Sequence, residues 1–180
     1  LQARGAFHVP TLPVAQPLRA SATRGGRTMS TTATCSPHLW WSELACHDRL
    51  MTPVPIDYRV DPTRGGALGD AFEALRAEVC AVMGMDTPLL VLSGYRTLEY
   101  QKLLAMNPRL KAATYSQHME LRAVDVALPR GLTFDEFAEC ARLATTHPDS
   151  PIRYVELRRT MSYIHIDVRP VKRLVIEEVT

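Results

Sequence analysis

Residues 115–128, which read YSQHMELRAVDVAL, bring a histidine and an aspartate seven residues apart around the start of an apolar run. The run AVDVAL is typical of a β-strand and carries Asp125 at its centre. A buried carboxylate is costly unless a positive group pairs with it. Asp125 therefore lies on a solvent-facing side of the strand or has a cationic partner, which is an arginine, a lysine or a metal ion.

A second strand carries similar chemistry. In YIHIDVR (163–169), alternation puts the apolar residues on one face and His165, Asp167 and Arg169 on the other. The same alternation places Asp125 opposite the valines of its strand and between two alanines. Small neighbours leave room above the sheet for something to bind. Each strand thus offers one apolar face to a core and one potential ligand on the other face.

Two imidazoles and one carboxylate leave the fourth position of a zinc ion open to water, which is the arrangement of a catalytic site. His118, Asp125 and His165 supply that set. Interpretations without a metal also remain open at this point: His118 as a surface loop residue, Asp125 paired with Arg122, Arg96 or Arg169, and His165 bonded to Asp167.

Three blocks of sequence occur in a recognisable order: SGYR (93–96), SQHMELRAVD (116–125) and YIHIDVR (163–169). Together they resemble the zinc D-alanyl-D-alanine carboxypeptidase family, with its pattern S-x-H-x-x-G-x-A-x-D followed by H-x-D. That family includes peptidoglycan peptidases and phage endolysins, and it shares its fold with the hedgehog signalling domain. The resemblance covers about residues 38–170.

The resemblance implies a zinc-dependent peptidase that hydrolyses peptidoglycan stem-peptide bonds, D-Ala-D-Ala or a related bond. It implies one Zn²⁺ per chain, bound by His118, Asp125 and His165. It also implies that Arg96 holds the substrate near the scissile bond and that Ser116 hydrogen-bonds it. The substrate would lie in the cell wall or periplasm, and the chain shows no clear signal segment.

The sequence departs from the family pattern at two positions. Leu121 stands at the family glycine, where a special backbone angle or a close approach is expected. Ser162 stands where many relatives carry an acid three residues before the last histidine ligand, and serine is no carboxylate base. Asp167 either takes the proton of the attacking water or orients His165, and the second role is favoured because ligating imidazoles need such an acceptor.

Two glutamates are further candidates for the catalytic base. Glu156 qualifies if its strand lies beside the site, whereas Glu120 is expected to face solvent.

A second hypothesis is a zinc-bearing domain of the same fold that binds cell wall or protein without catalysis, which both departures favour. A third is a metal-free α+β interaction domain.

The patterns along the chain predict an α+β fold: a small, mostly antiparallel sheet with helices packed on one side. The resemblance implies that this is the fold of hedgehog and D-Ala-D-Ala peptidases. Helices are expected at 38–50, at 67–83 with Gly84 as C-cap, at 97–105, and from a capping box of Thr133 and Glu136 to about 147. Residues 51–66 are expected to form a loop. Strands are expected at 89–92, 122–128, 152–157, 162–170 and 173–179, with 152–157 and 162–170 as antiparallel neighbours.

The 180 residues carry a net charge of +2, but residues 1–28 hold four arginines and no acid, so the remainder sums to −2. This balance argues against nucleic-acid binding, and no apolar run has the length of a membrane span. We expect a disordered arm at 1–36, with Met29 as a possible true start, and a single, monomeric domain at 37–180. A structural zinc at Cys35, His38, Cys46 and His47 is a minor alternative, because the spacing matches no standard motif.

Overall fold

The computed structural model describes residues 34–108, 110, 112–171 and 174–179. The predicted arm lies outside these residues, as does Met29, except for Thr34–Ser36. These three residues form strand β1, which pairs antiparallel with β2 (Leu39–Trp40). They therefore belong with the domain that we expected to start at residue 37.

The main sheet has five strands in the order β3-β4-β6-β5-β7. Their bounds are Val91–Ser93 for β3, Ala123–Ala127 for β4, Tyr154–Arg158 for β5, Tyr163–Asp167 for β6 and Val175–Glu178 for β7. Neighbouring strands run antiparallel, except that β5 and β7 run parallel. The α+β class and the hairpin of β5 and β6 are confirmed, and β7 makes the sheet mixed.

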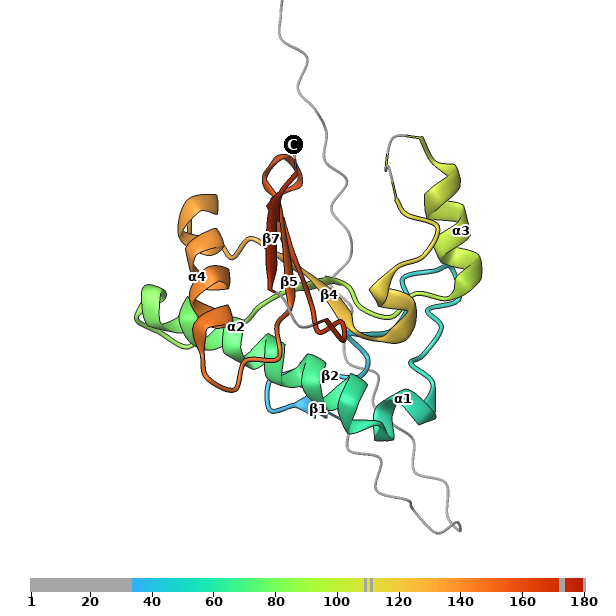
Figure 1. Cartoon of the computed structure of the whole chain (residues 1–180), viewed down its shortest axis with the longest axis horizontal. Coiled ribbons are helices and arrows are strands. Elements are labelled where there is room, and N and C mark those ends of the chain that lie inside the picture. The colour runs from blue at the N-terminus through green and yellow to red at the C-terminus, as the bar shows by residue number, and fades with distance from the viewer. Residues whose placement is uncertain (1–33, 109, 111, 172–173, 180) are drawn as a thin grey trace, which may run out of the picture. The chain divides into compact units, whose positions relative to one another are not determined.

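Two helices, α2 (Ala67–Met83) and α4 (Phe134–Thr146), cover one face of this sheet (Figure 1). Their apolar stripes bury Phe72, Leu75 and Phe137 against the apolar residues of β4, β5 and β6. The C-terminal end of α2 and the N-terminal end of α4 have the caps predicted from the sequence. Gly84 ends α2 in the left-handed conformation, and Thr133 and Glu136 form the capping box of α4.

The opposite face of the sheet carries the polar side chains, and helix α3 (Leu98–Met106) lies on that side (Figure 1). The expectation of helices on one side only is therefore wrong for α3. The short η2 turn (Gln117–Glu120), a 3₁₀ turn, leads from the α3 side into β4. Among the described residues, no helix combines the length and the apolar character that a membrane span requires.

The predicted helix at 38–50 is wrong: the segment contains β2 and a series of turns. Side chains in this segment accept hydrogen bonds from nearby backbone N–H groups, which would otherwise bond to backbone carbonyls in a helix. Glu43 accepts from the backbone N–H of Trp40, and Asp48 accepts from those of Leu50 and Thr52. Such local bonds compete with helix formation.

The expected loop at 51–66 is only partly correct. It contains α1 (Ile56–Val60) and a wide helical turn at Pro62–Gly66. Asp61 begins that turn, because its side chain accepts a hydrogen bond from the backbone of Thr63.

Candidate metal centre

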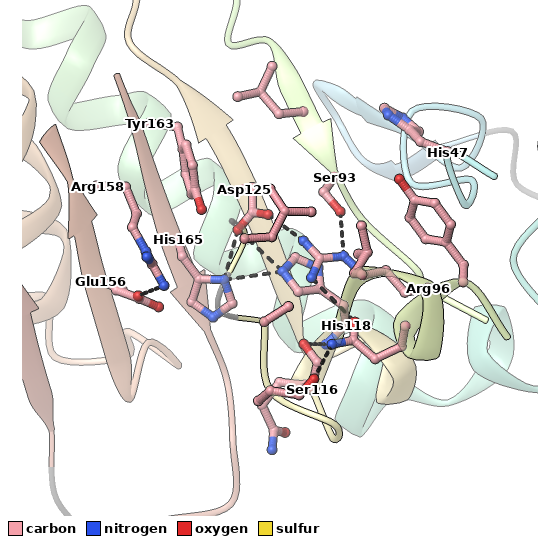
Figure 2. A pocket seen from close by; sticks show the side chains of 18 of the residues that line it. His47, Ser93, Arg96, Ser116, His118, Asp125, Glu156, Arg158, Tyr163 and His165 are labelled. Carbon is pink, nitrogen blue, oxygen red and sulfur yellow. Dashed lines mark hydrogen bonds and ion pairs between the residues drawn. The ribbon is translucent and has the colours of Figure 1, made fainter. Parts of the chain in front are cut away.

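The three residues predicted as metal ligands meet at one buried point (Figure 2). Oδ1 of Asp125 lies 2.8 Å from Nδ1 of His165 and 3.2 Å from Nε2 of His118. The two ring nitrogens are 3.2 Å apart. The structure therefore brings together side chains that lie up to 47 residues apart in the sequence.

Strand pairing accounts for two of the three positions. Asp125 of β4 is paired directly with His165 of β6, so their side chains stand next to each other on the same face of the sheet. His118 comes from the η2 turn. Leu121 follows this turn with φ of +50°, and its left-handed backbone redirects the chain into β4. The special backbone angle expected of the family glycine is thus present, although the residue is leucine.

The outer nitrogen of each histidine determines its tautomer. Nδ1 of His118 lies 2.6 Å from the carbonyl oxygen of Gly94, which only accepts, so Nδ1 carries the proton. Nε2 of His165 lies 3.3 Å from Oδ2 of Asp167, and it donates there for the same reason. In the neutral histidines the inner nitrogens are therefore lone-pair acceptors, and both face the carboxylate of Asp125.

Three acceptors at one point require a cation between them. In a tetrahedral zinc site with bonds of about 2.0–2.2 Å, neighbouring ligand atoms are about 3.3–3.6 Å apart. The observed separations of 2.8, 3.2 and 3.2 Å are slightly shorter, so the three side chains would move apart by a few tenths of an ångström around an ion. This buried group is therefore suited to hold a metal ion with only small movements of the side chains.

In the metal-free centre a proton takes the place of the cation. Burial disfavours the charged form of His165, but its hydrogen bonds to Asp125 and Asp167 outweigh burial and raise its pKa to about 9. Burial also opposes ionisation of Asp125, yet its interactions with His118 and His165 hold its pKa well below the usual range. The metal-free site thus favours one shared proton at the point where a metal would bind.

Arg96 binds the other oxygen of the same carboxylate. Its Nη2 donates to Oδ2 of Asp125 at 2.7 Å, its Nε to Oγ of Ser93 at 2.9 Å, and its Nη1 to Oε1 of Gln101 at 3.4 Å. The pairing of Asp125 with Arg96, one of the interpretations left open by the sequence, is confirmed. Because all three nitrogens have partners inside the protein, Arg96 holds Asp125 in place.

A cleft of about 700 Å³ opens over the three ligands. One wall comes from α3 and the segment after it, and the other from the β5–β6 hairpin, with residues that include Tyr100, Leu104, Tyr115, Tyr154, Arg158, Met161 and Tyr163. Ser116 also lines the cleft, next to His118. Its Oγ accepts a long hydrogen bond, 3.4 Å, from the backbone N–H of His118. It therefore caps the η2 turn and faces the cleft as well.

The two predicted catalytic carboxylates have different environments. Asp167 is fully buried, where it accepts from His165 and is bound by the guanidinium of Arg169. Glu156 lines the cleft, stands directly opposite His165 in the β5–β6 pair, and forms an ion pair with Arg158. The geometry suits Asp167 to orienting His165 and Glu156 to acting on a bound molecule. Glu120 forms an ion pair with Arg64 instead.

The alternative zinc site is not formed. Within the described part of the chain, His118, Asp125 and His165 are the only cluster of three or more candidate ligands that is able to hold a metal ion. Cys35 donates to the backbone oxygen of Gly65, and His38 pairs with Glu73. These partners are on the helix side of the domain, so the two residues are used in packing the N-terminal strands.

Sequence reasoning missed Gln101 and Arg158. Alternation along β5 places Arg158 on the same face as Glu156 and was sufficient to find it. Gln101 carried no such signal: it is buried in α3, where it accepts from Arg96 and donates to the carbonyl of Ala113.

No protein-family model and no curated protein matches this chain.

Proposed function

We propose that this protein is a zinc-dependent peptidase that hydrolyses peptidoglycan stem-peptide bonds, D-Ala-D-Ala or a related D-amino-acid amide bond. One observation carries the proposal: three buried acceptors, two imidazoles and a carboxylate, converge at the floor of an open cleft. A structural zinc site uses four protein ligands and is closed, whereas this set leaves a position toward the cleft. The sequence blocks of the peptidase family support the substrate class.

When bound, Zn²⁺ lowers the pKa of a water toward about 7 and polarises the scissile carbonyl. His118, Asp125 and His165 would hold the ion, while the carbonyl of Gly94 and the carboxylate of Asp167 fix the rings of the two histidines. These outer contacts keep the ligating nitrogens aimed at one point before any ion binds.

Glu156 is our candidate for the group that moves the proton. It stands opposite His165 across the strand pair and faces the cleft. It takes a proton from the attacking water and passes it to the nitrogen of the leaving group. Water thus adds across the C–N bond, which breaks to give a carboxylate and an amine. In this proposal Ser116, which lines the same cleft, hydrogen-bonds the substrate.

The decisive experiment compares purified peptidoglycan incubated with metal-free protein and with protein reconstituted with one equivalent of Zn²⁺. Released peptides and amino acids are identified by mass spectrometry. We expect product only from the zinc-loaded protein. We also expect Glu156→Gln to bind one zinc per chain yet lose about 10²–10⁴-fold in rate, the usual contribution of a general base.

The second candidate function is a zinc-bearing domain that binds cell wall without cleaving it. It is favoured by the ion pair between Glu156 and Arg158, which engages the proposed base. A chain that holds one zinc, binds peptidoglycan and releases no product has this function, and the hydrolase proposal is then wrong. Full activity of the Glu156→Gln variant would refute the role of Glu156 as the base, but not the peptidase proposal.

A further inference from the structure

Among the described residues, two buried polar atoms that belong to cleft-lining side chains have no hydrogen-bond partner. In the described part of the chain, four buried side-chain polar atoms lack one: Trp41 Nε1, Arg59 Nε, Gln117 Oε1 and Arg158 Nε. Gln117 and Arg158 both belong to cleft-lining residues. A buried polar group without a partner costs free energy, so such atoms mark places where a ligand gains by binding.

Arg158 differs in this respect from the other arginines of the cleft. Arg96 uses all three of its nitrogens on Asp125, Ser93 and Gln101. The guanidinium of Arg169 is bound twice by Asp167 and stacks on the ring of Tyr154. The guanidinium of Arg158 has one ion pair, to Glu156, and its side chain is 25 % exposed.

The place of Arg158 relative to the metal ligands follows from the strand register. Glu156 pairs with His165, and Arg158 lies two residues further along β5 on the same face (Figure 2). Two residues of a strand span about 6.6 Å. An extended peptide advances about 3.3–3.6 Å per residue, so a group one residue beyond a carbonyl at the metal centre comes within hydrogen-bonding reach of Arg158.

We infer that Arg158 recognises a free carboxylate of the substrate, one residue beyond the scissile bond. The inference rests on the proposed function and makes it more specific, because it selects peptides with a free C-terminus over cross-linked peptides. A guanidinium binds a carboxylate through two parallel hydrogen bonds, which here would come from Nε, which has no partner within the described residues, and from Nη2, which pairs with Glu156 in the absence of substrate.

Binding of this carboxylate also acts on Glu156. Arg158 and the substrate form a new ion pair in place of the one between Arg158 and Glu156. The carboxylate of Glu156 is thereby released toward the metal ligands, beside His165. The proposed base thus becomes available when a substrate with the correct terminus is bound.

A matched pair of substrates tests the inference: acetyl-D-Ala-D-Ala and its C-terminal amide. For the zinc-loaded protein we expect kcat/KM for the acid to exceed that for the amide by about 10–100-fold, the usual effect of a charged hydrogen bond. Arg158→Gln should bring the ratio close to 1, and Arg158→Lys should restore part of it. Arg159→Gln is the control, because this neighbouring arginine pairs with Asp135 and Glu178 on the exposed surface.

A binding measurement separates this inference from the proposed function. Calorimetry compares acetyl-D-alanine, which has no peptide bond between two amino acids, with its amide on the zinc-loaded full chain. Tighter binding of the acid that is lost in Arg158→Gln supports the inference even where no peptide is cleaved. Equal cleavage of acid and amide by the unmodified protein overturns the inference and leaves the peptidase proposal intact. That last comparison needs no variant, so a misfolded variant does not prevent the test.

Discussion

Leucine at position 121 combines a strained backbone with a fully buried side chain, and the two effects oppose each other. Its φ of +50° lies in the left-handed region, where a residue other than glycine pays about 1–2 kcal/mol. Its side chain is 0 % exposed and belongs to the hydrophobic core. We predict that Leu121→Gly, which introduces the residue of the family pattern, destabilises the protein.

The size of the effect follows from the two opposing contributions. Truncating a buried leucine to alanine costs about 2–5 kcal/mol, and removing the last methyl costs about 0.8 kcal/mol more. The extra freedom of glycine in the unfolded chain costs about 0.4–1 kcal/mol. Relief of the backbone strain returns about 1–2 kcal/mol. The net loss is about 3 kcal/mol, which lowers Tm by about 6–12 °C for a chain of this size.

Ser162 provides the matched control. It also has a left-handed backbone, with φ of +55°, but its side chain is exposed. Ser162→Gly should therefore leave the free energy of unfolding unchanged or raise it by up to about 1 kcal/mol. Urea unfolding of the metal-free proteins, fitted with one common slope m, measures the change in the free energy of unfolding for both variants. A Leu121→Gly protein as stable as the unmodified chain would refute the view that packing outweighs strain at this position.

Three further predictions concern the site and the cysteines. Between pH 6.5 and 9, metal-free protein should lose stability as pH rises through the raised pKa of His165. Over the same range the rise in Tm on adding Zn²⁺ should grow, because protons and metal compete for the same atoms. Thermal melts at several pH values check both trends, and a zinc-induced rise in Tm that becomes smaller as pH increases contradicts the proposed site. Asp167→Asn should weaken zinc binding by about 10–100-fold in competition with a chromophoric chelator, because His165 loses its charged acceptor, and unchanged affinity would contradict that role. Burial raises the pKa of Cys35 to about 12. At pH 8, Cys35 of the native protein should therefore be alkylated about 10³-fold more slowly than Cys35 of the unfolded protein. Peptide mass spectrometry follows the reaction, and rapid labelling of native Cys35 would contradict this prediction.

The strands that carry the ligands were predictable from the sequence because their patterns are local. Alternation in residues 163–169 assigned His165 and Asp167 to one face, and the same rule placed Asp125 opposite the valines of its strand. The convergence of the ligands depends on register, which no local pattern encodes. Only the pairing of Asp125 with His165, the middle one of the five residue pairs between β4 and β6, makes them neighbours.

The segment before α2 shows why other features were not predictable. Its apolar residues Leu39, Trp40 and Leu44 have spacing that also suits a helix, and the turns are decided by side-chain bonds such as that of Glu43 to the backbone of Trp40. The position of α3 depends on tertiary contacts as well. Gln101 links the helix to Arg96 and to the loop at Ala113, 5 and 12 residues away in the sequence, and no periodic pattern predicts either contact.

Three arginines were equivalent candidates for the partner of Asp125 when only the sequence was known, and the structure gives two of them, Arg96 and Arg169, different carboxylate partners. Arg96 binds Asp125 itself, so it compensates part of the buried negative charge. Arg169 does the same for Asp167, which in turn holds His165. Each buried carboxylate of the centre thus has its own guanidinium, and the remaining need for a cation lies where Oδ1 of Asp125 meets two imidazole lone pairs. A divalent ion satisfies all three atoms at once, whereas a single proton satisfies only one pair of them.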